Sequence, residues 1–190
     1  MLTTKFNEYL DLSAQLRPEY VESLGASAAE YGKPITDIVP DAPELLKAIY
    51  SAVSGTSEKV EDASLIEFIP GYKLIHIDEY ADKLEEVLGI LKGKDWDGKG
   101  IVLPILTNYS SDFICYYRSE DGVEQVCDLL HDFGDLTVMF DSPVAFLETL
   151  CQFYRQEVYF LDEDGYLDCD LIKEGEVGAE LNPAAIYWSE

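Results

Sequence analysis

The chain has 190 residues, of which 47% are hydrophobic and 12% aromatic, so it is too apolar to be disordered and long enough to bury a core of its own. Its 38 Asp and Glu residues against 13 Lys and Arg give a formal net charge of −25, which repels the phosphates of nucleic acids and attracts basic proteins. Nucleic acid is therefore not expected as a ligand, although acidity that serves only solubility remains an alternative to a basic partner.

The first forty residues predict a helix followed by a loop. Phe6, Leu10 and Leu16 outline one face of the helix. Pro18 interrupts it, and a Gly-Lys-Pro turn follows at residues 32–34. We expect this part to be a variable helical extension in front of the main core.

Two helices and a strand are predicted next. The apolar spacing over residues 41–53 is typical of a short helix, and residues 65–69 are typical of a strand that the following Pro-Gly pair ends. Asp78 is a candidate N-cap for an amphipathic helix that closes near Gly93.

Beyond the polar loop at 94–100 the hydrophobic period changes to that of strands. The strands are expected at 101–105, 112–117, 123–127 and 136–140. A Ser-Glu-Asp-Gly turn at 119–122 joins two of them, and the short connections indicate an antiparallel meander. Ser142 and Pro143 then form a typical N-cap and first position of a helix.

The last predicted unit is a hairpin of residues 157–161 and 166–170, turned at Asp164 and Gly165. The tail from 171 to 190 either docks on the body or stays mobile. The whole pattern predicts a single α+β domain over residues 1–190, with a mostly antiparallel sheet meander and helices packed on one side.

No pattern in the sequence indicates a catalytic residue, a metal site or a cofactor. His76 and His131 are each isolated, and the acidic turn at 162–165 has its glycine too early for a calcium loop. A nucleophile motif and a phosphate-binding loop are also missing, so we expect no enzyme. A hydrolase with scattered carboxylates remains an outside alternative.

The cellular context follows from the cysteines and the N-terminus. The four cysteines lie in apolar segments without a CxxC pair, as reduced core thiols do. The first residues do not form a signal peptide, and no apolar run approaches the ~20 residues of a membrane span. We therefore expect a soluble protein of the cytoplasm that does not bind membranes.

Several short motifs, taken in order, resemble the SUKH superfamily (the Smi/Knr type). They are FIPGYKL at 68–74, the helix start IDE at 77–79, Trp96, VLPI at 102–105, DFIC at 112–115, DSPVAFL at 141–147 and the hairpin at 159–170. The resemblance covers residues 41–170. The glycines that the family often carries after its Leu-Pro-Ile strand are missing from residues 107–111, although Asp112 is kept.

The superfamily contains bacterial immunity proteins that neutralise toxins, many of them nucleases, and fungal regulators of cell-wall glucan synthesis. The resemblance thus implies a SUKH-like fold and a non-enzymatic protein-binding function. The first hypothesis is an immunity protein whose acidic surface covers a basic toxin. The alternative is a regulatory or scaffolding module that binds a cellular protein or a small ligand.

Eight residues are candidates for the partner-binding surface. They are Trp96, Tyr109, Asp112, Tyr116, Tyr117, Asp162, Asp164 and Asp168. Aromatic side chains supply most of the affinity at protein interfaces, and carboxylates would frame them against a basic partner. Successive side chains on a strand point to opposite faces, so at least one of the two strand tyrosines is expected in the core. Trp96 could equally cover a sheet edge.

Overall fold

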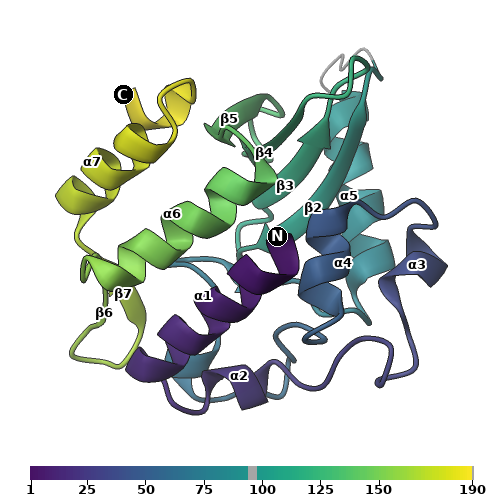
Figure 1. Ribbon diagram of the computed structural model, residues 1–190. Coiled ribbons are helices and arrows are strands. Elements are labelled where there is room, and N and C mark those ends of the chain that lie inside the picture. The colour runs from purple at the N-terminus through teal and green to yellow at the C-terminus, as the bar shows by residue number, and fades with distance from the viewer. Residues whose placement is uncertain (94–97, 190) are drawn as a thin grey trace.

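A computed structural model describes residues 1–93 and 98–189 of the chain. Its centre is an antiparallel sheet in which the strands follow one another in the order β1-β2-β3-β4-β5 (Figure 1). These strands are β1 (Lys73–Leu74), β2 (Ile101–Thr107), β3 (Phe113–Arg118), β4 (Glu124–Leu129) and β5 (Leu136–Phe140). The predicted α+β class and the meander are thus confirmed.

The remaining elements surround this sheet. The helices are α1 (Leu2–Leu16), α2 (Tyr20–Ser23), α3 (Ile35–Ile38), α4 (Glu44–Tyr50), α5 (Tyr80–Gly93), α6 (Pro143–Arg155) and α7 (Leu171–Leu181), with 3-10 turns η1 (Ala63–Leu65) and η2 (Ile186–Ser189). A separate hairpin pairs β6 (Tyr159–Leu161) with β7 (Leu167–Cys169). The expected cap of α6 is confirmed, since the Ser142 hydroxyl accepts the Ala145 N–H and Pro143 opens the helix.

Helices lie against both faces of the sheet. The ammonium of Lys83 on α5 lies 5.8 Å from the centre of the Phe113 ring, whereas Phe146 on α6 packs edge-on against Phe140, with ring centres 5.0 Å apart. The strand register puts Phe113 and Phe140 on opposite faces. The sequence predicted helices on one side of the sheet only. The structure has α6 and its neighbours on one face, and α5 on the other face, behind the strands (Figure 1).

The N-terminal forty residues contribute to the same core. Helix α1 lies beside α6 (Figure 1), and its Phe6 and Tyr9 are completely buried. The Tyr9 ring centre lies 4.4 Å from that of Phe68, and its hydroxyl donates to the Phe68 carbonyl at 2.6 Å. Each such ring removes about 150–250 Å² of surface from water. Residues 1–40 thus stabilise the fold that they precede.

The strand expected at residues 65–69 is wrong. A single bridge joins Ile69 to Tyr72 across the Pro-Gly turn, in which Gly71 has a φ of +80°. The preceding carbonyl groups accept side-chain donors: that of Ile66 takes the Thr56 hydroxyl, and that of Glu67 takes the Arg17 guanidinium. Since side chains satisfy this backbone, it has no need of a partner strand.

The sequence left open whether residues 171–190 dock on the rest of the protein or stay mobile. In the structure the described part of this tail docks. Helix α7 begins at Asp170, whose carboxylate accepts the N–H groups of Ile172 and Lys173. The Trp188 ring in η2 lies against Phe140, and its indole N–H donates to the Met139 carbonyl on β5. The tail therefore covers β5, one edge of the sheet.

Candidate functional site

Two of the predicted residues, Tyr116 and Tyr117, are neighbours on β3 and point to opposite faces. Tyr116 is 1% exposed, and its hydroxyl donates to the carboxylate of Glu124 on β4. Tyr117 is half-buried beside Gly100, where an added Cβ would lie 2.9 Å from its ring. Tyr116 is thus a core residue and cannot contact a partner in this conformation. Trp96 lies outside the described residues.

The turn between β2 and β3 presents Tyr109, which is 88% exposed. Asn108 holds the turn: its Oδ1 accepts the N–H groups of Ser110 at 2.8 Å and Asp112 at 2.9 Å, and its amide donates to the Asp112 carboxylate at 3.1 Å. Ser111 takes the left-handed conformation, with φ 61°, that a glycine would otherwise supply. The asparagine thus explains how the turn at residues 107–111 forms without glycines.

Asp112 in this turn joins the loop that follows β4. Its Oδ1 accepts the His131 N–H at 3.0 Å and lies 3.1 Å from the ring Nδ1, while the other ring nitrogen lies 3.1 Å from Asp132. Burial opposes ionisation of Asp112, but the hydrogen bonds from His131 and Asn108 outweigh it and lower the pKa. Asp112 therefore stays a carboxylate at neutral pH.

Asp128, on β4, is a carboxylate that the sequence reasoning missed. It is 8% exposed, and its Oδ1 accepts no hydrogen bond from the described residues. Burial and the nearby charge of Asp112 raise its pKa to about 6. The available signal was an aspartate inside an otherwise apolar strand, between Cys127 and Leu129. Asp128 adds negative charge beneath the exposed turn whenever it is ionised.

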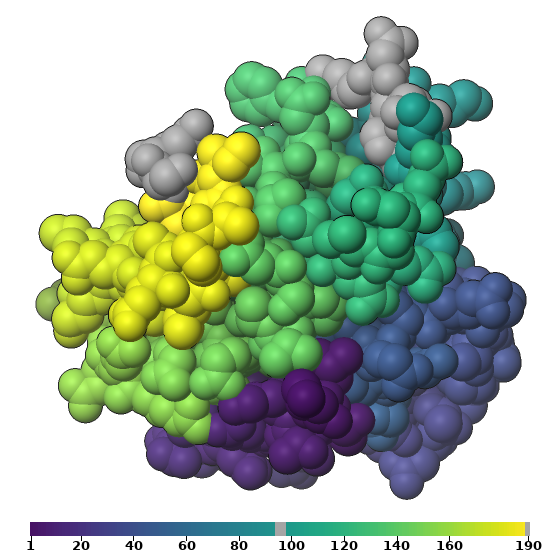
Figure 2. Space-filling model, turned by 45° about the horizontal axis from the view of Figure 1, so that its top comes forward, coloured from purple at the N-terminus to yellow at the C-terminus, as the bar shows by residue number. Residues whose placement is uncertain are grey.

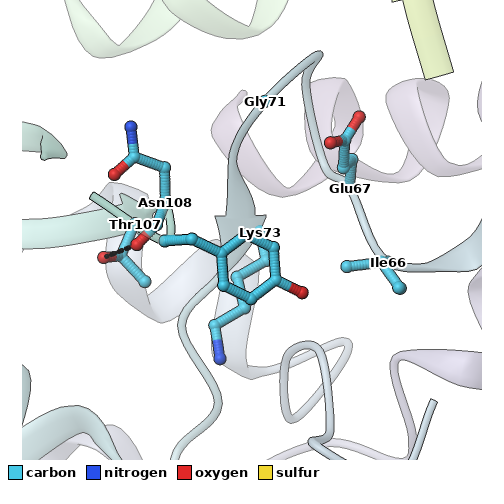
Figure 3. A pocket seen from close by; sticks show the side chains of 7 residues that line it. Ile66, Glu67, Gly71, Lys73, Thr107 and Asn108 are labelled. Carbon is cyan, nitrogen blue, oxygen red and sulfur yellow. Dashed lines mark hydrogen bonds between the residues drawn. The ribbon is translucent and has the colours of Figure 1, made fainter. Parts of the chain in front are cut away.

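A small pocket separates the β2–β3 turn from the segment at 66–73. Figure 3 shows Thr107 and Asn108 on one side and Ile66 and Glu67 on the other. Its cavity volume is only about 10 Å³, far below the ~300–1,000 Å³ of most small-molecule sites. Lys73 in its wall already pairs with the Glu79 carboxylate at 3.3 Å. The pocket is thus too small to hold a drug-sized ligand in this conformation.

Glu67 links this pocket to the β6–β7 hairpin. It is half-buried, and its Oε2 accepts no hydrogen bond from the described residues. Burial raises its pKa, and the charges of Asp162 and Asp168 on the hairpin raise it further. Two groups of predicted residues, the β2–β3 turn and the hairpin, therefore both lie near Glu67.

The hairpin turn is fixed by one of its own carboxylates. Oδ1 of Asp162 accepts the N–H groups of Asp164 at 2.9 Å and Tyr166 at 2.8 Å, and Gly165 has a φ of +86°. Asp164 and Asp168 are exposed. Asp162 is thus a structural residue of the turn, while Asp164 presents its carboxylate to solvent. Asp168 is also exposed, and its Oδ1 accepts the Cys169 N–H at 2.8 Å.

Negative charge is concentrated in the second part of the chain. Residues 143–190, from α6 onward, carry 11 Asp and Glu against two basic residues, Arg155 and Lys173, which is −9 of the total −25. The elements from α6 onward, green to yellow in Figure 2, lie together on one side of the molecule. The hairpin belongs to this side, so its carboxylates stand in a wider negative field.

The candidates for metal binding and for thiol chemistry are the His, Cys, Asp and Glu side chains of the described residues. None of their His, Cys, Asp and Glu side chains form a group of three or more that could hold a metal ion. Burial raises the thiol pKa of Cys151 to about 11 and that of Cys127 to about 12, so these thiols stay protonated and unreactive. In the same ranges no helix has both the length and the apolar character to cross a bilayer.

Comparisons with family models and with curated protein sequences found no relative. No family model matches the chain, and no curated protein sequence matches it. The resemblance to the SUKH superfamily therefore rests on the short motifs quoted above.

Proposed function

We propose that this protein is a non-enzymatic, SUKH-type immunity protein of the cytoplasm that binds a basic toxin and covers its functional surface. The observation that supports this proposal is the acidic surface formed by the β2–β3 turn, Glu67 and the β6–β7 hairpin. Tyr109 stands exposed in the β2–β3 turn, and Asp164 and Asp168 stand exposed on the hairpin. We call it the acidic surface below.

Its loops are held in place before any partner arrives. Asn108 fixes the β2–β3 turn, and Asp162 fixes the hairpin turn, each through two backbone N–H groups. A preformed surface loses less conformational entropy on binding than a flexible one. The surrounding charge would raise the association rate toward ~10⁸ M⁻¹s⁻¹ at low salt.

The test begins with basic proteins encoded beside the gene of this chain. Each is expressed in a bacterial host with and without this protein, and growth is measured. Relief of toxicity, together with binding that weakens as salt rises, is the expected result. A candidate that is not neutralised, or a neutral partner whose binding ignores salt, would contradict the proposal and leave the regulatory or scaffolding module as the function to pursue.

Two matched variants locate the binding surface. In the test variant Asp162, Asp164 and Asp168 are changed to Asn, which keeps the hydrogen-bond acceptor of the turn. The control variant makes the same change at exposed positions far along the chain, Asp11, Asp37 and Asp82. We expect only the test variant to lose protection, because the two variants have equal net charge and differ in where it lies.

A further inference from the structure

The outer face of the β6–β7 hairpin carries exposed aromatic rings. Phe160 is 41% exposed and Tyr166 is 48% exposed. The register pairs Phe160 with Asp168, and pairs Leu161 with the buried Leu167. Because side chains alternate along a strand, Phe160 and Asp168 share the face that points away from the core.

Tyr166 belongs to the same face. It lies opposite Asp162, since the Asp162 N–H donates to the Tyr166 carbonyl at 2.9 Å. Position 166 is two residues from Asp168, so both side chains point outward. Phe160 and Asp168 are directly opposite each other in the pair, where Cβ atoms lie about 4.5–5.5 Å apart. A single flat side chain can therefore contact a ring and a carboxylate of this face at once.

The first turn of α7, which follows the hairpin directly, carries exposed aliphatic side chains. Leu171 and Ile172 are each 76% exposed. They follow directly on Asp170, whose N–H donates to the Val158 carbonyl at 2.9 Å and so fixes the start of α7 beside the hairpin. We call Phe160, Tyr166, Asp168, Leu171 and Ile172 the hairpin face.

The charge around the hairpin face determines what can cover it. Glu163 and Asp164 in the turn are exposed, Asp168 lies between the rings and α7, and Glu67 holds a carboxylate oxygen that accepts no hydrogen bond from the described residues. A second copy of this chain would bring the same carboxylates against themselves, which opposes binding. Exposed aromatic rings surrounded by carboxylates are complementary to a positively charged, planar side chain of a partner.

We propose that the hairpin face binds arginine side chains of the basic partner, with the guanidinium stacked on Phe160 or Tyr166 and its N–H groups donating to Asp168. Arginine fits better than lysine, because its planar group stacks on aromatic rings and forms a two-point contact with a carboxylate, whereas the lysine ammonium is a compact, strongly hydrated charge. This inference rests on the proposed function and names the chemistry by which the same site recognises its partner.

The probes are two synthetic peptides of equal length and charge, one of alternating arginine and glycine and one of alternating lysine and glycine. Affinity is measured by calorimetry at roughly 0.15 M salt, where surface charges farther apart than ~8 Å are screened. Backbone amide shifts of the isotope-labelled protein locate the contact. We expect the arginine peptide to bind about ten-fold more tightly, with shifts centred on residues 159–172.

Two variants separate stacking from charge. Phe160→Ser with Tyr166→Ser is expected to remove the preference for arginine and to leave a weak, salt-sensitive binding of both peptides. Asp168→Asn is expected to weaken the arginine peptide more than the lysine peptide, because it removes the forked contact. Because Phe160 and Tyr166 are each about half-buried, circular dichroism of every variant checks that the fold is retained before binding is measured.

Two controls match these changes elsewhere on the chain. Phe133→Ser removes an aromatic ring that is 67% exposed, and Asp82→Asn removes an exposed carboxylate on α5. Neither is expected to alter the preference for arginine. Equal affinity of both peptides, shifts spread over α5, an equal effect of the controls, or a concentration-dependent dimer that Phe160→Ser dissolves would each overturn the inference.

The toxicity assay distinguishes this inference from the proposed function. If no basic neighbour is neutralised while the peptides still distinguish arginine from lysine, the immunity function fails and the arginine site stands. If a toxin is neutralised equally well by the protein with Phe160→Ser and Tyr166→Ser, the function stands and the arginine site fails.

Discussion

Gly178 on α7 is expected to tolerate no side chain, because Trp188 occupies the space beside it. A Cβ built at Gly178 would lie 2.5 Å from Cε3 and 2.7 Å from Cε2 of the indole. The ring cannot simply move away, since it packs against Phe140 and Phe153 and its N–H donates to the Met139 carbonyl. Gly178→Ala should therefore strain the contact between the tail and β5.

Gly175, one turn earlier in the same helix, is the matched control, with no atom within 4 Å of its added Cβ. Gly175→Ala is expected to stabilise the protein by about 0.8–1 kcal/mol, the usual gain from replacing glycine inside a helix. Gly178→Ala gains the same helix propensity but adds overpacking worth about 1–3 kcal/mol. Its free energy of unfolding should thus be lower than that of the control by about 1–3 kcal/mol.

Urea denaturation followed by tryptophan fluorescence measures both variants. A difference of about 2 kcal/mol corresponds to roughly 4–8 °C in Tm for a protein of this size. Combining Gly178→Ala with Trp188→Leu should remove most of the penalty, because the colliding ring is then gone. If the two glycine variants are equally stable, the packing of Trp188 on α7 is not as described and the reasoning fails.

Three further changes probe buried polar groups by urea denaturation. Asn182→Ala should lower the free energy of unfolding by about 2–3 kcal/mol. The Asn182 amide donates hydrogen bonds to the Thr149 hydroxyl and the Gly178 carbonyl, and its oxygen accepts the Asp141 N–H. A decrease of less than about 1 kcal/mol would contradict this. Arg17→Lys should cost a similar amount, because lysine cannot reproduce the fork of contacts made by this buried guanidinium; an unchanged midpoint would count against it. Burial raises the pKa of Asp128 to about 6, so its contribution to stability is complete below pH ~4 and is lost as pH rises through about 6. Asp128→Asn should flatten that fall and stabilise the protein at pH 8 by about 1–2 kcal/mol; an unchanged pH profile would refute the assignment.

Local signals were enough to predict the centre of the fold. The bounds of β5 were predicted as 136–140 and observed there, and the cap of α6 and the turn of the β6–β7 hairpin also follow from residues close in sequence. Each of these features depends on residues that interact with others close in sequence; for example, the Ser142 hydroxyl accepts the Ala145 N–H.

Tertiary contacts explain where the prediction failed. Residues 65–69 have the composition of a strand, yet donors from Thr56 and Arg17 satisfy their carbonyl groups. Helix α7 was not predicted, because Gly175 and Gly178 are typical of loops. Only the position of Trp188, ten residues later, shows why a glycine is needed there.

Individual residues of the candidate site could be predicted from the sequence, but which of them lie close together in the fold could not. The exposed Tyr109 and the hairpin carboxylates were found from loop position and charge. The contact between Asp112 and His131, nineteen residues apart, depends on Phe113 pairing with Leu129. The closeness of Glu67 to Asp168 likewise exists only once the chain has folded.

The C-terminal tail covers the edge strand β5, and this protects the protein against edge-to-edge aggregation. An open sheet edge offers unpaired backbone groups to the edge of another molecule, and this is a common start of aggregation. Here the Trp188 indole N–H donates to the Met139 carbonyl at one edge of the sheet. The other edge is the two-residue strand β1, which carries the charged Lys73. A chain shortened before residue 182 is therefore expected to keep its meander but to form β-rich aggregates as its concentration rises.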